Sequence, residues 1–243
     1  MKSLVELAHL KQLPTIQQMD QETILWIESN QPKTFVSKRN FKKYAKLGIT
    51  LLKDIKTIKK DWFLEPLLFN SGVHGVRHLL RSAVYSQIII ENSSLTKKQA
   101  LQVITATLIH DMRRLHDKRD EGHEKRAVEW FTENSGELAL MLNTEWSREE
   151  ISEICSLVSN DKNATKNNIE KLKQVKNSSD ALDRYRAARL DWRPNDNYIK
   201  AKLPDNIHHF AFKLVVESEK IALNSTDDKE SICLALENMS STL

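Results

Sequence analysis

The sequence predicts an all-α protein, built as a helical bundle, for three reasons. Apolar residues recur at the three- and four-residue spacing of helices along most of the 243-residue chain. No segment alternates convincingly between apolar and polar residues, as a half-buried strand would. Only 5 Gly and 5 Pro are present, fewer than a protein rich in tight turns needs. With 40% hydrophobic and 29% charged residues, the composition also excludes a disordered chain.

The predicted helices follow one another with short connections. In the segment 41–62, Phe41, Leu52 and Trp62 recur on one face. Ser71 is the candidate N-cap of the helix at 73–91, and Ser147 with Glu150 forms a capping box before the helix at 147–159. The predicted set is 18–29, 41–62, 73–91, 97–115, 122–134, 147–159, 169–190, 205–224 and 228–239.

Charge divides the chain more clearly than composition does. The net charge is +4, yet residues 33–62 hold ten Lys or Arg and two acids, whereas residues 1–32 carry a net −2. We therefore expect an N-terminal helical segment with a basic helix at 1–65, followed by the main helical domain at 66–243. No flexible linker separates the two, so the first helices could equally pack against the main body as one unit.

The lysines of the helix at 41–62, between Lys42 and Lys60, lie around its polar faces. The simplest interpretation is a packed helix with a solvated lysine face. Clustered lysines also attract phosphates regardless of sequence, which would suit nucleic acid or an anionic membrane surface. The preference for Lys over Arg argues against base-specific recognition.

Cysteine usage and hydropathy indicate the compartment. Cys155 and Cys233 are too few for a disulfide scaffold or a thiolate zinc cage. No signal peptide is visible at 1–10, and no run of about 18 apolar residues predicts a membrane span. We expect a cytoplasmic protein.

The strongest chemical signal is His110-Asp111 at the end of the apolar helix at 97–115. An imidazole and a carboxylate at the end of a buried helix are costly unless they are paired or bind a metal. Two other helices carry similar groups. His74 and His78 share one face of the helix at 73–91, and Asp180 begins an Asp-Ala-Leu-Asp sequence on the helix at 169–190.

Histidine and carboxylate ligands suit borderline or hard divalent cations, with positions left open for water. Such an ion lowers the pKa of a bound water and offsets charge on a phosphoryl oxygen. These residue types do not choose among Mn, Fe, Co, Ni and Mg.

The segments 74–81, 108–114 and 179–184, in this order, resemble the HD superfamily of metal-dependent phosphohydrolases, in particular a bacterial subset of HD-domain proteins. The resemblance covers about half of the chain, 71–190. It implies an HD-domain-like bundle with additional N-terminal helices, and hydrolysis of a phosphate ester of a nucleotide or nucleotide-derived compound by a metal-activated water. The absence of a Gly-Tyr-Pro signature argues against a cyclic-di-GMP phosphodiesterase of that type.

The resemblance also implies roles for individual residues. His74 competes with His78 as the first metal ligand, and we prefer His78. The implied metal ligands are His78, His110, Asp111 and Asp180. The implied substrate-binding residues are His74, Arg81, Arg114 and Asp183, and the implied catalytic residues are Asp111, Arg114 and His123.

Several of these residues have a second interpretation. Arg81 and Arg114 either bind substrate phosphate or hold a ligand aspartate in place. Asp117, Asp120 and His123 form a second metal site or supply a general acid, or else lie in an exposed charged loop before a helix. Asp180 could instead pair with Arg184, and Asp183 with Arg186, along the helix.

Two other functions stay open. A metal-independent phosphodiesterase would use His78 and His110 as base and acid, and the His-Gly-x-x-His sequence at 74–78 resembles bacterial effector domains of that kind, which act on phosphoribosylated ubiquitin. A non-catalytic HD-fold module would bind a nucleotide or nucleic acid without turnover. Buried charged residues would be a poor way to build such an inert scaffold.

Overall fold

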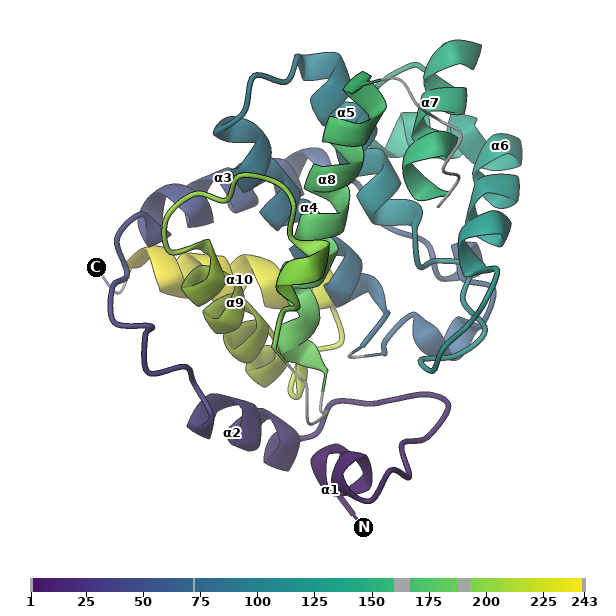
Figure 1. Ribbon diagram of the computed structural model, residues 1–243. Coiled ribbons are helices and arrows are strands. Elements are labelled where there is room, and N and C mark those ends of the chain that lie inside the picture. Colours follow the sequence, from purple (N-terminus) through teal and green to yellow (C-terminus); the bar gives the residue numbers. More distant parts are fainter. Residues whose placement is uncertain (1, 72, 160–166, 188–192, 242–243) are drawn as a thin grey trace.

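The computed structural model describes residues 2–71, 73–159, 167–187 and 193–241, and these ranges consist of helices and connecting segments without a β-strand (Figure 1). The all-α prediction is confirmed. The α-helices are α1 (Leu4–His9), α2 (Gln21–Ser29), α3 (Phe41–Asp54), α4 (Val76–Glu91), α5 (Lys97–Ile109), α6 (His123–Met141), α7 (Arg148–Val158), α8 (Asn167–Leu182), α9 (Ile207–Ala222) and α10 (Asp228–Ser241). Short 3₁₀ helices are η1 (Lys60–Trp62), η2 (Pro66–Leu68), η3 (Asp183–Arg186) and η4 (Asp196–Tyr198).

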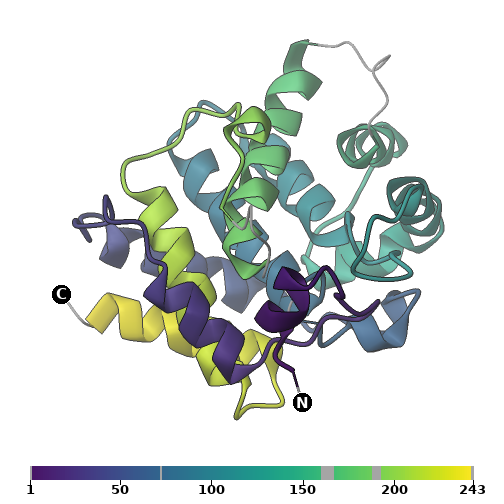
Figure 2. The same cartoon turned by 60° about the horizontal axis from the view of Figure 1, so that its bottom comes forward.

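Helix α4 is the centre of the bundle. It packs against α3, α9 and α10 on one side and against α5 and α8 on the other, as the two views in Figures 1 and 2 show. Its buried residues include not only apolar side chains but also His78 and Arg81, both with no exposed surface. The interior of the protein therefore contains charged and titratable groups that need partners.

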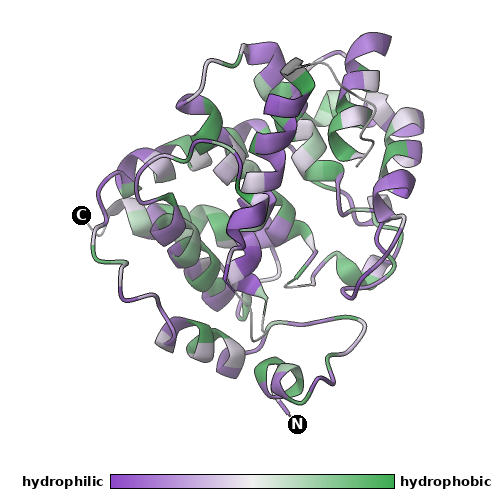
Figure 3. Ribbon diagram, in the orientation of Figure 1, coloured by the Kyte–Doolittle hydropathy of each residue, from purple (hydrophilic) through white to green (hydrophobic). Residues whose placement is uncertain are grey.

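The basic helix α3 belongs to the same core. A Cβ atom on Gly48 would lie 2.9 Å from the side chains of both Val84 and Leu236, so α3 approaches α4 and α10 as closely as glycine allows. Among the described residues, Leu4, Val5 and Ala8 of α1 form a small apolar cluster separate from this core. Green apolar and purple polar faces lie side by side on the helices in Figure 3. The domain boundary near residue 65 stays a prediction.

Two predicted helices end earlier than expected. The helix predicted at 41–62 ends at Asp54, because Ile55 is extended and fully buried and the next backbone N–H, that of Lys56, donates to the carbonyl of Met141. Residues Lys60–Trp62 then form a separate 3₁₀ turn. Similarly, the helix predicted at 97–115 ends at Ile109, with His110 as its C-cap.

The start of α4 also differs from the prediction. Gly75, not Ser71, is the N-cap. The Ser71 hydroxyl accepts the N–H of Val73 and donates to the carboxylate of Asp117. A Cβ atom on Gly75 would lie 2.6 Å from the carbonyl oxygens of Leu68 and Phe69, so the chain can enter α4 here only without a side chain.

The other predicted helices also form, with differences at some of their ends. The capping box of Ser147 and Glu150 opens α7 as expected. Helix α6 kinks at Asn134, where the predicted helix ends, and continues to Met141. The helix predicted at 169–190 becomes α8 followed by η3, and its residues 188–190 lie outside the described ranges. Helix α1 was not predicted, although Ser3 and Glu6 form a capping box.

The polar faces of α3 and the segment after it are exposed, as the solvated-face interpretation expects. The exposed lysines are Lys42, Lys43, Lys46, Lys53, Lys56, Lys59 and Lys60. Binding of nucleic acid by this face stays a prediction. Within the described ranges, each helix is too short or too polar to cross a membrane.

Candidate metal centre

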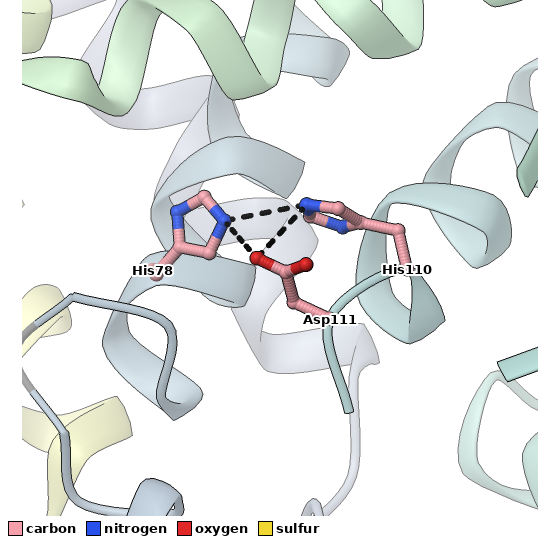
Figure 4. Close-up of side chains that lie close together, drawn as sticks. All are labelled: His78, His110 and Asp111. Atoms are coloured by element: carbon pink, nitrogen blue, oxygen red, sulfur yellow. Dashed lines mark hydrogen bonds and ion pairs between the residues drawn. The ribbon is translucent and has the colours of Figure 1, made fainter. Parts of the chain in front are cut away.

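Three elements deliver the candidate ligands to one point. His78 lies in the first turn of α4, His110 and Asp111 directly follow α5, and Asp180 lies near the end of α8. Figure 4 shows His78, His110 and Asp111 pointing toward one another. Because α5 ends at Ile109, the doublet sits on the turn after the helix, where adjacent side chains can face the same point.

The ligand atoms are as close together as the ligands of one ion. His78 Nε2 and His110 Nε2 lie 3.3 Å apart, and Asp111 Oδ2 lies 3.5 and 3.6 Å from them. Asp180 Oδ1 joins the group at 3.4 Å from His78 and 3.7 Å from His110. Two ligands about 2.1 Å from a shared ion are roughly 3.0–3.5 Å apart. The buried group of His78, His110 and Asp111 could therefore hold a metal ion.

Both histidines are held with Nε2 toward this point. His78 Nδ1 lies 2.9 Å from the buried carboxylate of Asp183, and His110 Nδ1 lies 2.7 Å from the backbone carbonyl of Thr107. A carbonyl or carboxylate accepts a hydrogen from Nδ1, so this tautomer leaves the Nε2 lone pair free. Metal-ligating histidines usually have such a partner on the other ring nitrogen.

The carboxylates of the group are held in the ionised form. Burial raises the pKa of Asp111, but the charges of His110, His74 and Arg114 outweigh it and keep that pKa well below the usual value. For Asp180, burial is likewise outweighed by His110 and His78, so its pKa is lowered. Ionised carboxylates are the form that binds a cation.

His74 and His123 flank Asp111 without joining the group. His74 Nδ1 lies 2.8 Å from Asp117, and its Nε2 lies 3.9 Å from Asp111. The structure thus brings His78, rather than His74, to the other ligands. Burial lowers the pKa of His74 to about 4 despite the neighbouring carboxylates. His123 donates from Nδ1 to the carbonyl of Asp120, and its Nε2 lies 3.4 Å from Asp111.

Arg114 holds Asp111 in place. Its guanidinium donates to Asp111 Oδ1 at 3.2 Å and to the carbonyls of His116 and Lys118. Of its two predicted interpretations, the geometry favours the one in which it orients a ligand aspartate, although it also lines the pocket described next.

A pocket of about 360 Å³ opens beside the ligand group. His74, His110 and Asp111 form part of its wall, together with Asp180. Basic side chains also line it: Arg114, Lys176, Arg184 and Arg186. The pocket therefore combines candidate metal ligands with positive charge, which suits an anionic ligand.

The structure corrects two predicted substrate-binding residues. Arg81 has no exposed surface and donates to Asp183 at 2.8 and 3.1 Å and to Glu219 at 2.6 Å. Asp183 is equally buried and accepts from Arg81, His78 and Tyr85. Neither residue lines the pocket, because each is bound to the other inside the bundle. They position His78 instead.

The loop residues after the doublet do not form a second metal cluster in the described part of the chain. Asp117 accepts from Ser71 and from the backbone N–H of Gln17. Asp120 accepts from Arg126 and from the backbone N–H of Leu115. The prediction of a second site at Asp117, Asp120 and His123 is therefore wrong, and only His123 faces the candidate centre.

Lys176 and Arg186 line the pocket but are not among the site residues that the sequence predicts. Arg186 lies next to the ligand group, with one guanidinium nitrogen 3.4 Å from His78 Nε2 and 3.9 Å from Asp180 Oδ1. Lys176 precedes Asp180 by one helical turn. Spacing along the predicted helix could have placed Lys176 beside Asp180, but nothing in the sequence distinguishes it from neighbouring lysines.

No protein-family model, no curated protein and no solved structure matches the chain.

Proposed function

We propose that the protein is a metal-dependent phosphohydrolase or phosphodiesterase that acts on a nucleotide or nucleotide-derived phosphate ester. One observation carries the proposal: the Nε2 atoms of His78 and His110 and the carboxylates of Asp111 and Asp180 converge within 3.3–3.7 Å beside a basic pocket. A divalent ion (Mn, Fe, Co, Ni or Mg) fits this donor set.

When bound, such an ion would supply a water of lowered pKa and would offset negative charge on a phosphoryl oxygen. The chain's own residues prepare for this chemistry. Asp183 and the Thr107 carbonyl orient the two imidazoles, and Arg114 orients Asp111. Arg186 supplies positive charge where the phosphate would lie.

Proton transfer is assigned to His123. Its Nδ1 hydrogen is bound to the carbonyl of Asp120, so its Nε2 is the atom that takes up or releases a proton. That atom lies beside Asp111 at the wall of the pocket, within reach of a leaving group held there.

The proposed location is intracellular. Cys155 and Cys233 are both free thiols, which suits a reducing compartment.

A metal-independent phosphodiesterase is the second candidate. One observation favours it: the guanidinium of Arg186 lies 3.4 Å from His78 Nε2, where it places positive charge without an ion. His74, held by Asp117, then adds a further imidazole at the pocket. Activity that survives thorough chelation would support this candidate over the first.

The deciding experiment measures metal content and activity together. Purified protein and the Asp111→Ala variant are analysed for bound metal and then assayed with Mn²⁺ or Ni²⁺ on phosphomonoesters and phosphodiesters. Asp61→Ala serves as the matched control, because Asp61 is an exposed aspartate outside the site. We expect near-stoichiometric metal and turnover in the parent and control, and neither in a folded Asp111→Ala protein. A parent that binds no ion, even after Mn²⁺ or Ni²⁺ is added, would contradict the proposal.

A further inference from the structure

Lys176 is a buried cation in the wall of the candidate pocket. It lies on α8, one turn before Asp180, and only 4% of its surface is exposed. Lys176 and its neighbour Asn177 both line the pocket that also contains Asp111 and Asp180. Residues four apart on a helix share one face, so Lys176 borders the pocket on the same side of α8 as Asp180.

Lys176 differs from the other buried cations in its lack of a partner. Arg77 is paired with Glu219 and Asp228, Arg81 with Asp183 and Glu219. Arg114 and Arg186 also have carboxylates within 4 Å, as their ion pairs with Asp111 and Asp183 show. The Lys176 ammonium forms no hydrogen bond and no ion pair with any residue in the described ranges.

Buried lysines are normally paired, because an ammonium without water or a counter-charge is unfavourable. The Lys176 ammonium is not among the fully buried side-chain atoms that lack a hydrogen-bond partner in the described ranges, so it still reaches solvent. Lys176 lines the pocket, so its ammonium can meet solvent or a ligand there. An anion that enters the pocket would provide the missing partner. Lysine suits this task because its ammonium is a compact charge with three donors that can turn toward a phosphate.

We propose that Lys176, assisted by the amide of Asn177, binds a second phosphoryl group of the substrate. The proposal rests on the proposed function, in which the reacting phosphoryl group lies beside His110, Asp111 and Asp180. Four residues, about 6 Å along the axis, separate Asp180 from Lys176. This spacing is suited to two directly linked phosphoryl groups. The favoured substrates are therefore diphosphates rather than monophosphates.

Equilibrium binding tests this subsite without requiring turnover. Titration calorimetry measures Mn²⁺ first, and then orthophosphate and pyrophosphate on the Mn²⁺-loaded protein. The variants are Lys176→Met, which keeps the length of the side chain, and Lys176→Arg, which keeps the charge. Lys171→Met is the matched control, since Lys171 is an exposed lysine on the same helix.

We expect the parent to bind pyrophosphate at least tenfold more tightly than orthophosphate. Lys176→Met should lose about ten- to hundredfold in pyrophosphate affinity, the effect of one charged hydrogen-bonding group, with Mn²⁺ and orthophosphate affinities unchanged. Lys176→Arg should retain most of the preference and Lys171→Met all of it. Equal pyrophosphate affinity in the parent and Lys176→Met overturns the subsite. A parent that binds no Mn²⁺ overturns the proposed function instead. In that case the pyrophosphate affinities of the metal-free parent and of metal-free Lys176→Met are compared. This comparison still decides the role of Lys176.

Discussion

Asp183 provides the sharpest test of how the bundle supports its candidate centre. Its carboxylate accepts two hydrogen bonds from Arg81, at 2.8 and 3.1 Å, and further bonds from His78 and Tyr85. All of these partners are fully buried. Removing the negative charge therefore leaves the Arg81 guanidinium with Glu219 as its remaining charged partner.

The expected cost of Asp183→Asn follows from this arrangement. Loss of one partner of a buried ion pair costs about 3–5 kcal/mol in stability. The lower end applies, because the asparagine oxygen can still accept one bond and Glu219 still neutralises Arg81. We expect the free energy of unfolding to fall by about 3 kcal/mol, a large part of the ~5–15 kcal/mol of a typical domain.

Urea denaturation, followed by tryptophan fluorescence, measures this loss. With a slope of about 3 kcal/mol per M, the midpoint should fall by about 1 M. Asp61→Asn is the control, since Asp61 is an exposed aspartate outside the site, and it should cost less than about 1 kcal/mol. A loss below about 1 kcal/mol for Asp183→Asn would refute the view that this carboxylate compensates Arg81.

Two further predictions concern stability away from the ligand group. Gly75→Ala should destabilise the protein by at least about 2 kcal/mol in thermal or urea unfolding, because the new Cβ meets backbone carbonyls; Gly136→Ala, with nothing within 4 Å, should be neutral or slightly stabilising. Burial raises the pKa of Asp120, but Arg126 and the Leu115 N–H lower it below the usual value. Asp120→Asn should therefore lower the free energy of unfolding by about 1–2 kcal/mol at pH 6. The difference in stability between the parent and the variant should shrink toward pH 3, where the Asp120 carboxylate becomes protonated. A difference that does not change with pH would contradict a stabilising role of the ionised Asp120.

The pattern of the sequence predicted most of the helices but not where two of them end. Ile55 continues the apolar spacing of α3, yet it is buried from an extended backbone. The same holds after Ile109, where the apolar run continues into Met112 but the helix does not. Neither end carries a Gly or Pro, and both are set by contacts with distant segments that local periodicity does not contain.

The candidate site was likewise predicted only in part. The order of the histidine and aspartate residues was enough to suggest His78, His110, Asp111 and Asp180, and the structure brings these four together. The same order of residues could not predict the role of Arg81, because its partner Glu219 lies 138 positions away in the sequence. Residue type gives the available chemistry, whereas only the packing decides whether a charge faces a pocket or another buried charge.

The hydrogen bonds between Asp117 and the N-terminal segment have a consequence for how the protein is made. The backbone N–H of Gln17 donates to Asp117, 100 positions later. At about 5–20 residues per second, a ribosome needs roughly 5–20 s to synthesise the intervening chain. The segment around Gln17 therefore leaves the ribosome well before the carboxylate that fastens it. The segment around Gln17 can form this hydrogen bond only after Asp117, which is also the partner of His74, has emerged.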